Sequence, residues 1–211
     1  RVLNVGDNSK LRDLNWADTR TLLIDLSATV RIEGAPRAQA TWEFWRTMAA
    51  SVGGGEPRLL LMDDETRKFV TGAQVLVASP TRPGVVTMSA WDFSGARQGQ
   101  SIGTRLHDDR RDSGWVYTLF DVDTATGKGR VTERGTPFTS QWLVRPDGTP
   151  LARAEWQPAK KEFSVHVRDG SGWRVIHQQS GYDWLDLAGT TADGKALVAV
   201  GENGMDRARA W

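Results

Sequence analysis

One short segment of the sequence matches the sequence motif of a hydrolase site. Residues 99–103 read G-x-S-x-G, the pattern in which hydrolases hold a nucleophilic serine on a strained turn between a buried strand and a helix. Here Ser101 follows residues 94–98, which are too small and polar to form a buried strand, and charged residues without helical periodicity come after it. Because the motif depends on this structural context, we do not expect Ser101 to be a nucleophile.

The three histidines give no catalytic or metal-binding constellation. A serine nucleophile needs a histidine base that a carboxylate orients, but His166 lies in a strand pattern and His177 ends one, so both are expected to be hydrogen-bonded structural side chains. No two histidines, His107 included, stand at the spacing of metal ligands, and there is no cysteine. The glycines of residues 53–55 lack the lysine and helix of a phosphate loop. We therefore predict no catalytic residue, no metal site and no cofactor.

A dense group of charges occupies residues 105–112. The simplest interpretation is a solvated cluster that neutralises itself, since surface ion pairs contribute little to stability. The alternative is a polar gate or docking patch for a peptide or a neighbouring domain. The candidate substrate or docking residues are then the three arginines and the tryptophan that opens the next strand: Arg105, Arg110, Arg111 and Trp115.

The elements that would position these residues form an internal repeat. In four places an apolar strand, a turn with Asp or Gly, and a second strand follow one another, at residues 11–26, 73–88, 140–154 and 183–200. Three of these hairpins are followed by another, at residues 42–62, 115–133 and 162–178. Asp-Gly turns favour tight hairpins, and two successive hairpins make the four-stranded antiparallel meander of a propeller blade.

The predicted fold is therefore all-β, a partial β-propeller of about three and a half four-stranded blades. The blades are placed at approximately residues 10–70, 71–135, 136–180 and 181–211, the last one incomplete, so that we expect an unpaired edge and an uncovered apolar face. One segment has an alternative. Residues 38–50 are rich in alanine, and Trp42, Trp45 and Ala49 have helical spacing, which would also fit a short helix.

The longest connections join the second and third strands of the units. They cover residues 28–40, 92–114 and 201 onward, and alternate connections of a meander emerge on opposite faces. The long loops are thus expected on one face, and loops on a rigid scaffold commonly carry binding sites. We take this face as the expected working surface.

Composition excludes several classes of protein. Apolar residues make up 39% of the 211 residues and charged residues 25%, with a formal net charge of +1, so that neither disorder nor a nucleic-acid or anionic-membrane partner is indicated. The ten tryptophans are expected to pack mostly in the core. The absence of cysteine excludes disulfides but leaves the compartment open, bacterial periplasm or cytoplasm alike.

Two stretches resemble a known family. Residues 115–128 resemble blade hairpins of the prolyl oligopeptidase family of serine peptidases, and so do residues 135–142 continued through 147–156. Similar segments occur in bacterial dipeptidyl-peptidase-like and acylaminoacyl-peptidase-like members. In that family an N-terminal propeller covers a C-terminal α/β-hydrolase domain and filters the peptides that reach its Ser-Asp-His triad.

The resemblance implies a non-catalytic role for this chain. No hydrolase domain is present in residues 1–211, so none of the family's triad residues has a counterpart here. The expected function is to gate or admit peptide substrate to a hydrolase domain, which would be the main partner together with the peptides. The alternative is a stand-alone propeller that serves as a protein-interaction scaffold and self-associates through its incomplete blade edges.

Overall fold

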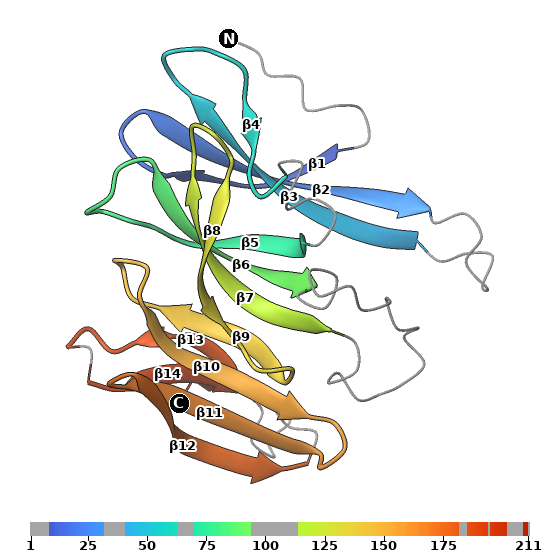
Figure 1. The fold of residues 1–211 in the computed structure, drawn as a ribbon, viewed down its shortest axis with the longest axis vertical. Helices are drawn as coiled ribbons and strands as arrows, with labels where there is room; N and C mark the ends of the chain where they lie inside the picture. Colours follow the sequence, from blue (N-terminus) through green and yellow to red (C-terminus); the bar gives the residue numbers. More distant parts are fainter. Residues whose placement is uncertain are drawn as a thin grey trace.

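The computed structural model describes residues 9–31, 41–62, 70–93, 114–181, 185–193, 195–201 and 209–210. Throughout these residues the protein is all-β and contains no helix (Figure 1). The strands form four open antiparallel sheets, none of which closes on itself. Each sheet takes its strands from one continuous stretch of chain, and sequential neighbours pair within it.

The first two sheets have four strands each. The first contains β1 (Ser9–Trp16), β2 (Thr21–Arg31), β3 (Thr41–Ser51) and β4 (Arg58–Leu59), in that spatial order. The second contains β5 (Val70–Ala78), β6 (Val85–Phe93), β7 (Trp115–Asp123) and β8 (Gly129–Arg134).

The third sheet repeats this arrangement and the fourth is smaller. The third contains β9 (Thr139–Val144), β10 (Pro150–Gln157), β11 (Glu162–Asp169) and β12 (Gly172–Ser180). The fourth contains β13 (Asp186–Thr190), β14 (Leu197–Gly201) and β15 (Arg209–Ala210). The hairpins predicted from strand pattern and turn residues are confirmed in all four sheets, although the first strand of the last hairpin begins three residues later than expected.

The helical alternative for residues 38–50 is wrong where the structure describes it. Residues 41–51 form β3, which pairs with β2 along its whole length, from Thr21 opposite Ser51 to Arg31 opposite Thr41. A partner strand of equal length pairs with the backbone of this segment throughout, so tertiary pairing overrides its local helical spacing.

The strand predicted at residues 58–62 is shorter than expected. After Leu59 the chain leaves the first sheet, and Leu61 has a φ of 54°. The Leu61 amide donates to the carbonyl oxygen of Gly127 in the second sheet, at 2.9 Å. Leu60 and Leu61 are both 1% exposed, because they pack between the two sheets instead of extending β4.

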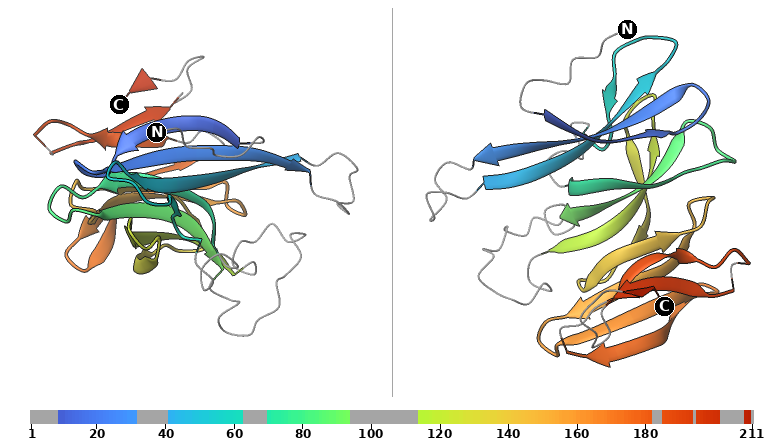
Figure 2. Two further views of the ribbon diagram at one scale, coloured as in Figure 1. Left: turned by 90° about the horizontal axis from the view of Figure 1, so that it is seen from above. Right: turned by 180° about the vertical axis from the view of Figure 1, so that it is seen from behind.

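The four sheets stack face to face in chain order (Figure 2), and each contact buries its own apolar cluster. Leu23, Ala49, Leu60, Met88 and Phe120 belong to the cluster of the first and second sheets. The second and third sheets meet through Tyr117, Leu119, Trp142 and Trp173, and the third and fourth through Ala154, Phe163, Val165, Leu187 and Leu197. Inner strands are therefore buried on both faces, which explains the nearly continuous burial along β6.

The tryptophans follow the packing expectation in part. Trp142 is buried, and its Nε1 donates to the Tyr117 carbonyl oxygen across the sheet interface at 3.1 Å. Trp91 and Trp173 pack against the same cluster, and Trp156 packs in the next one. Trp16 is an exception, because β1 is an edge strand and leaves the ring 59% exposed.

The long connections begin at the ends expected for one face. β2 ends at Arg31 and β6 at Phe93, and both strand ends point to the same side of the molecule (Figure 1). Residues 28–31, which the sequence assigned to the first of these connections, belong to β2. Most of the remaining residues of the three connections lie outside the described part of the chain.

Candidate functional site

Most of the residues selected from the sequence lie outside the described part of the chain. This is the case for Arg105, Arg110 and Arg111, and also for Ser101 and His107. The docking role of the three arginines therefore remains a prediction.

Trp115 is described, and it lies where the long connection rejoins the second sheet. It is the first residue of β7 and stands opposite Phe93, the last residue of β6. Their ring centroids are 5.2 Å apart with a tilt of 46°, a geometry that favours aromatic pairs. The packing closes the end of the β6–β7 ladder, so Trp115 has a structural contact at the mouth of the predicted docking loop.

The two described histidines make side-chain hydrogen bonds, as expected. His166 Nε2 lies 3.0 Å from Ser164 Oγ, and His177 Nε2 lies 2.9 Å from Gln179 Oε1. Burial lowers the pKa of His166 below its ordinary value, an effect that the Glu155 carboxylate opposes and the Arg153 charge reinforces.

Ser164, His166 and Glu155 have the composition of a hydrolytic triad but not its geometry. A triad needs the serine on one ring nitrogen and the carboxylate on the other. Here Glu155 Oε2 lies 3.6 Å from the same Nε2 that contacts Ser164. Ser164 is also only 7% exposed, so a substrate has no access to its hydroxyl. We conclude that these three residues do not form a nucleophile site.

They belong instead to a polar cluster between the second and third sheets. Arg153 Nη2 pairs with Glu155 Oε1 at 2.9 Å, and its guanidinium lies over the Trp173 ring, 4.6 Å from the centroid. Arg168 packs on the same ring at 5.1 Å and reaches Glu133 of β8, 3.4 Å away. The cluster therefore joins β8 to the third sheet by charge and by cation–π contact.

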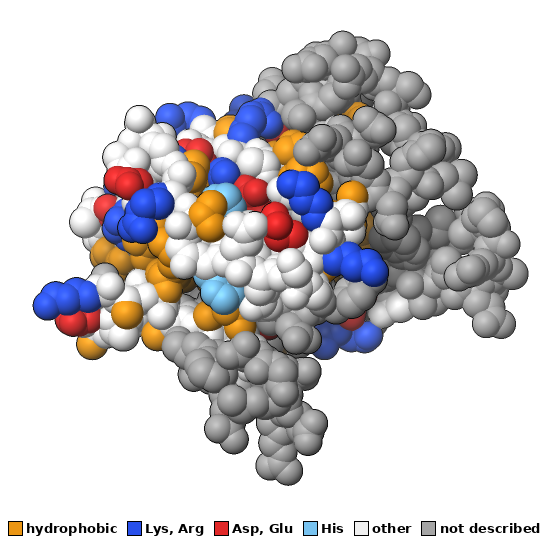
Figure 3. Space-filling view, turned by 90° about the horizontal axis from the view of Figure 1, so that it is seen from below, with side chains coloured by type: hydrophobic (Ala, Val, Ile, Leu, Met, Phe, Trp, Pro, Cys, Tyr) orange, Lys and Arg blue, Asp and Glu red, His pale blue; other side chains and the backbone are white. Residues whose placement is uncertain are grey.

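The end of the molecule formed by the last two sheets carries mixed charge. Among the residues of this view that the structure describes, Figure 3 shows acidic, basic and histidine side chains interspersed. Such a mixed surface agrees with the formal net charge of +1.

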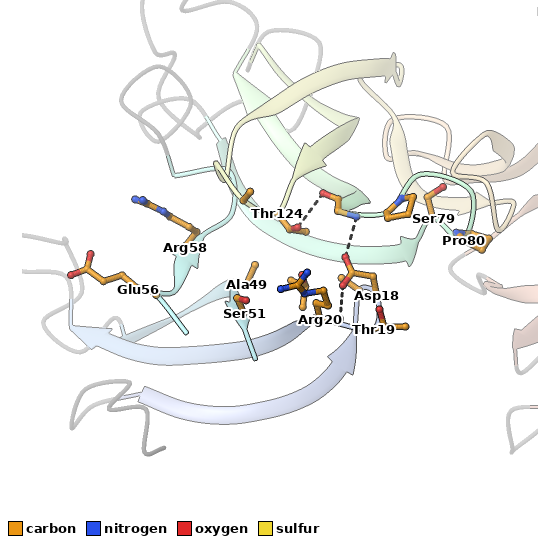
Figure 4. Close-up of a pocket in the computed structure, with 16 residues that line it drawn as sticks. Asp18, Thr19, Arg20, Ala49, Ser51, Glu56, Arg58, Ser79, Pro80 and Thr124 are labelled. Carbon is orange, nitrogen blue, oxygen red and sulfur yellow. Dashed lines mark hydrogen bonds between the residues drawn. The ribbon is translucent and has the colours of Figure 1, made fainter. Parts of the chain in front are cut away.

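A groove of about 830 Å³ lies among the hairpin turns of the first two sheets (Figure 4). Its walls come from four turns: β1–β2, β3–β4, β5–β6 and β7–β8. Alanines and prolines supply apolar surface and hydroxyl side chains supply polar groups: Ala17, Ala49, Pro80, Pro83, Ser51, Ser79 and Thr124. This volume is in the range of small-ligand sites.

Hydrogen bonds between the turns fix the shape of the groove. The Gly84 amide of the β5–β6 turn donates to Asp18 Oδ2 in the β1–β2 turn at 3.1 Å. The Gly84 carbonyl accepts from the Thr124 amide and hydroxyl of the β7–β8 turn, at 2.8 and 3.1 Å. Three turns from two sheets are thereby tied to one another.

Asp18 makes these hydrogen bonds as an ionised carboxylate. Partial burial tends to raise its pKa, but hydrogen bonds from Arg20, Thr21 and Gly84 outweigh burial and hold the pKa below the ordinary value. Both carboxylate oxygens are engaged, since the Arg20 amide donates to Oδ1 at 2.8 Å while Gly84 occupies Oδ2.

The groove also contains a central arginine. In Figure 4 the Arg20 side chain lies between Ser51 and Asp18, whereas Arg58 and Glu56 are drawn beyond Ser51. No ion pair is formed by Arg20 or Arg58 with any carboxylate of the described residues. The sequence predicted residues 17–20 only as a turn, because a turn signal does not reveal which other turns will surround it.

The groove and the predicted working surface lie at opposite ends of the strands. The β1–β2 and β5–β6 turns precede β2 and β6, whereas the long connections leave from the far ends of these two strands. No group of three or more His, Cys, Asp or Glu side chains within the described ranges could hold a metal ion.

Comparison with known proteins gives no family assignment: neither the family models nor the curated proteins match this chain. In the described part of the chain, no helix is long and apolar enough to cross a membrane.

Proposed function

We propose that the four sheets are consecutive blades of a β-propeller, at about the blade positions predicted from the sequence. Three features support this proposal. Each sheet is a meander in strict chain order, successive sheets pack face to face, and the first strand of the third sheet, β9, contacts the first strands of both neighbouring sheets, β5 and β13. In a propeller the first strands of successive blades surround a common axis, so contacts between first strands are expected.

We further propose that the chain is a non-catalytic module which admits peptide substrate to an α/β-hydrolase domain of a prolyl-oligopeptidase-type serine peptidase. The main support is the repeat of four-stranded meanders, which is the architecture expected from the resemblance. The geometry at Ser164, His166 and Glu155 also supports a non-catalytic role, because both neighbours of the imidazole share one nitrogen.

A fluorophosphonate probe tests this function. We expect no labelling of residues 1–211, and labelling of a serine outside them in the protein made from the whole reading frame that encodes this chain. Ser101→Ala should leave the labelling unchanged. Modification of Ser101 would make the chain itself a hydrolase, and the absence of any labelled serine in the whole protein would exclude the peptidase.

A second candidate function is a stand-alone interaction scaffold that self-associates. The exposed edge strand β1 favours it, because Leu11, Leu14 and Trp16 are 57%, 50% and 59% exposed. Sedimentation equilibrium of the wild-type chain and of a Leu14→Asp variant distinguishes the two candidates. A scaffold of this kind is a dimer that the substitution dissociates, whereas a peptidase module remains a monomer in both forms.

A further inference from the structure

We propose that the groove among the hairpin turns of the first two sheets binds an acidic peptide segment, with Arg20 contacting a ligand carboxylate. This site is distinct from the proposed substrate-admitting face, because the groove lies at the opposite ends of β2 and β6. Peptide binding in the groove therefore does not depend on the peptidase proposal.

The backbone around Arg20 is held in place on both sides. Its amide donates to Asp18 Oδ1 at 2.8 Å, and its carbonyl oxygen accepts from the Val52 amide at 2.9 Å. The side chain itself forms no ion pair with the described residues and is exposed. A fixed backbone beneath a guanidinium that pairs with none of the described carboxylates lowers the ordering cost of binding, since mainly the side chain must be immobilised.

The charges around Arg20 leave its guanidinium available. Asp18 is the nearest carboxylate along the chain; its oxygens accept the backbone amides of Arg20 and Gly84, and it forms no ion pair with the Arg20 guanidinium. In Figure 4, Glu56 and Arg58, which carry opposite charges, are drawn on the side of Arg20 opposite Asp18. The Arg20 guanidinium thus forms no ion pair with the described carboxylates of the groove, and a guanidinium binds a carboxylate with two parallel hydrogen bonds.

The remaining lining favours a peptide over a compact inorganic anion. The lining combines apolar surface from Ala17, Ala49 and Pro83 with the hydroxyl groups of Ser51 and Thr124. A groove of about 830 Å³ exceeds what a single small anion would fill. Aliphatic surface beside hydrogen-bonding groups suits a short extended chain that carries both side chains and backbone amides.

Isothermal titration calorimetry at low salt tests the proposal. The probes are two hexapeptides, acetylated and amidated at their ends, one alternating alanine with glutamate and the other alanine with glutamine. We expect the glutamate peptide to bind at least tenfold more tightly than the glutamine peptide. Arg20→Gln should weaken binding of the glutamate peptide at least tenfold, and Arg20→Lys by less.

Arg174→Gln is the matched control. Arg174 is an exposed arginine of β12, 64% exposed and 3.4 Å from Asp169 in the third sheet, so its loss changes the net charge equally without touching the groove. This variant should bind like the wild type. The proposal would be overturned if the wild type bound neither peptide or bound both equally. It would also be overturned if Arg20→Gln kept the wild-type affinity for the glutamate peptide, or if Arg174→Gln lost as much affinity as Arg20→Gln.

The result is separable from the proposed function. If Arg20→Gln loses peptide binding, the fluorophosphonate labelling pattern should not change. If no serine is labelled, the affinity of the groove for the glutamate peptide should not change either. Because the Arg20 side chain makes no ion pair with the described residues, its variants are expected to unfold at the wild-type temperature, which circular dichroism checks.

Discussion

At the scale of single residues, the hairpin turns are also the contacts between sheets. Gly127 shows this most clearly. It has a φ of 74°, and its carbonyl oxygen accepts from Leu61 at 2.9 Å. A Cβ atom at this position would lie 2.4 Å from the carbonyl oxygen of Leu59. The turn therefore requires glycine for its conformation and also for its close approach to the first sheet.

We predict that Gly127→Ala destabilises the protein by about 3 kcal/mol, because a left-handed conformation and a backbone clash add together. Gly170→Ala is the matched control. Gly170 is another turn glycine, with a φ of 57°, and a Cβ atom there would meet no other atom within 4 Å, so its cost is about 1 kcal/mol. Urea denaturation at neutral pH measures both. Equal losses for the two variants would show that the contact with Leu59 is unimportant.

His166 predicts a pH dependence of stability. Its pKa in the folded protein lies below the ordinary value of 6.5, so at pH values between the two the unfolded chain binds more protons. This contribution is complete above about pH 6.5 and is lost as the pH falls through the window down to the folded pKa.

The measurement is the urea midpoint between about pH 7.5 and 5.5, the range in which histidines titrate. The midpoint of the wild type should fall, and His166→Gln should flatten the profile. His177→Gln serves as the control, since it removes the other described histidine from the neighbouring strand. If the urea midpoint of His166→Gln depended on pH as steeply as that of the wild type, His166 would not be the source of the pH dependence.

At the scale of elements, the third sheet presents a polar face to the second sheet. Arg153 and Glu155 of β10 and His166 and Arg168 of β11 share this face, as the register of the two strands requires. Alternation along a strand places residues two positions apart on the same face. It did not predict that this face would be covered, because burial depends on the stacking of the preceding sheet.

We predict that Glu155→Gln destabilises the protein by about 3 kcal/mol, because it leaves Arg153 buried without its charge partner. The side chains of Arg153 and Glu155 are only 10% and 7% exposed, so solvent screens their interaction little. The double variant Arg153→Met, Glu155→Gln should recover most of the loss, since it removes the uncompensated charge. Additive losses in this double-mutant cycle would show that the pair is not coupled.

At the scale of the whole molecule, each pair of adjacent sheets is joined by its own side-chain hydrogen bonds. Asp18 and Gly84 join the first two sheets, and Arg82 joins the second to the third by bonding Asp121 and the Asp147 carbonyl. Gln141 joins the third to the fourth, since its Oε1 accepts from the Leu187 amide and its Nε2 donates to Asp186 Oδ1, both at 2.8 Å. The sheets are thereby linked as a series.

A serial arrangement predicts local opening of the last sheet. Gln141→Ala should accelerate hydrogen exchange of the Leu187 amide several-fold, because a bond worth about 1 kcal/mol is lost at one interface only. Amides of the first sheet should exchange at the wild-type rate. Gln178→Ala, which removes a bond to Glu162 within the third sheet, is the control. Uniform acceleration in all sheets would indicate one cooperative unit in place of a series.

Local sequence patterns were sufficient to predict most strands, their hairpins and the grouping into four sheets. These follow from apolar strand segments and from turns with Asp and Gly, which act within a few residues. Local patterns were least reliable where tertiary pairing governed the outcome. β3 is a strand although its residues also fit a helix, and β4 ends early because Leu61 bonds to another sheet.

The contacts between sheets could be read from the folded chain alone. Asp18 and Gly84 are 66 positions apart, and no local signal in either turn specifies the other. Likewise, the sequence placed His166 in a strand pattern, but the folded sheet was needed to show that Glu155 and Ser164 contact the same imidazole nitrogen. Such contacts depend on the stacking of whole sheets, and this stacking therefore sets the chemistry of each candidate site.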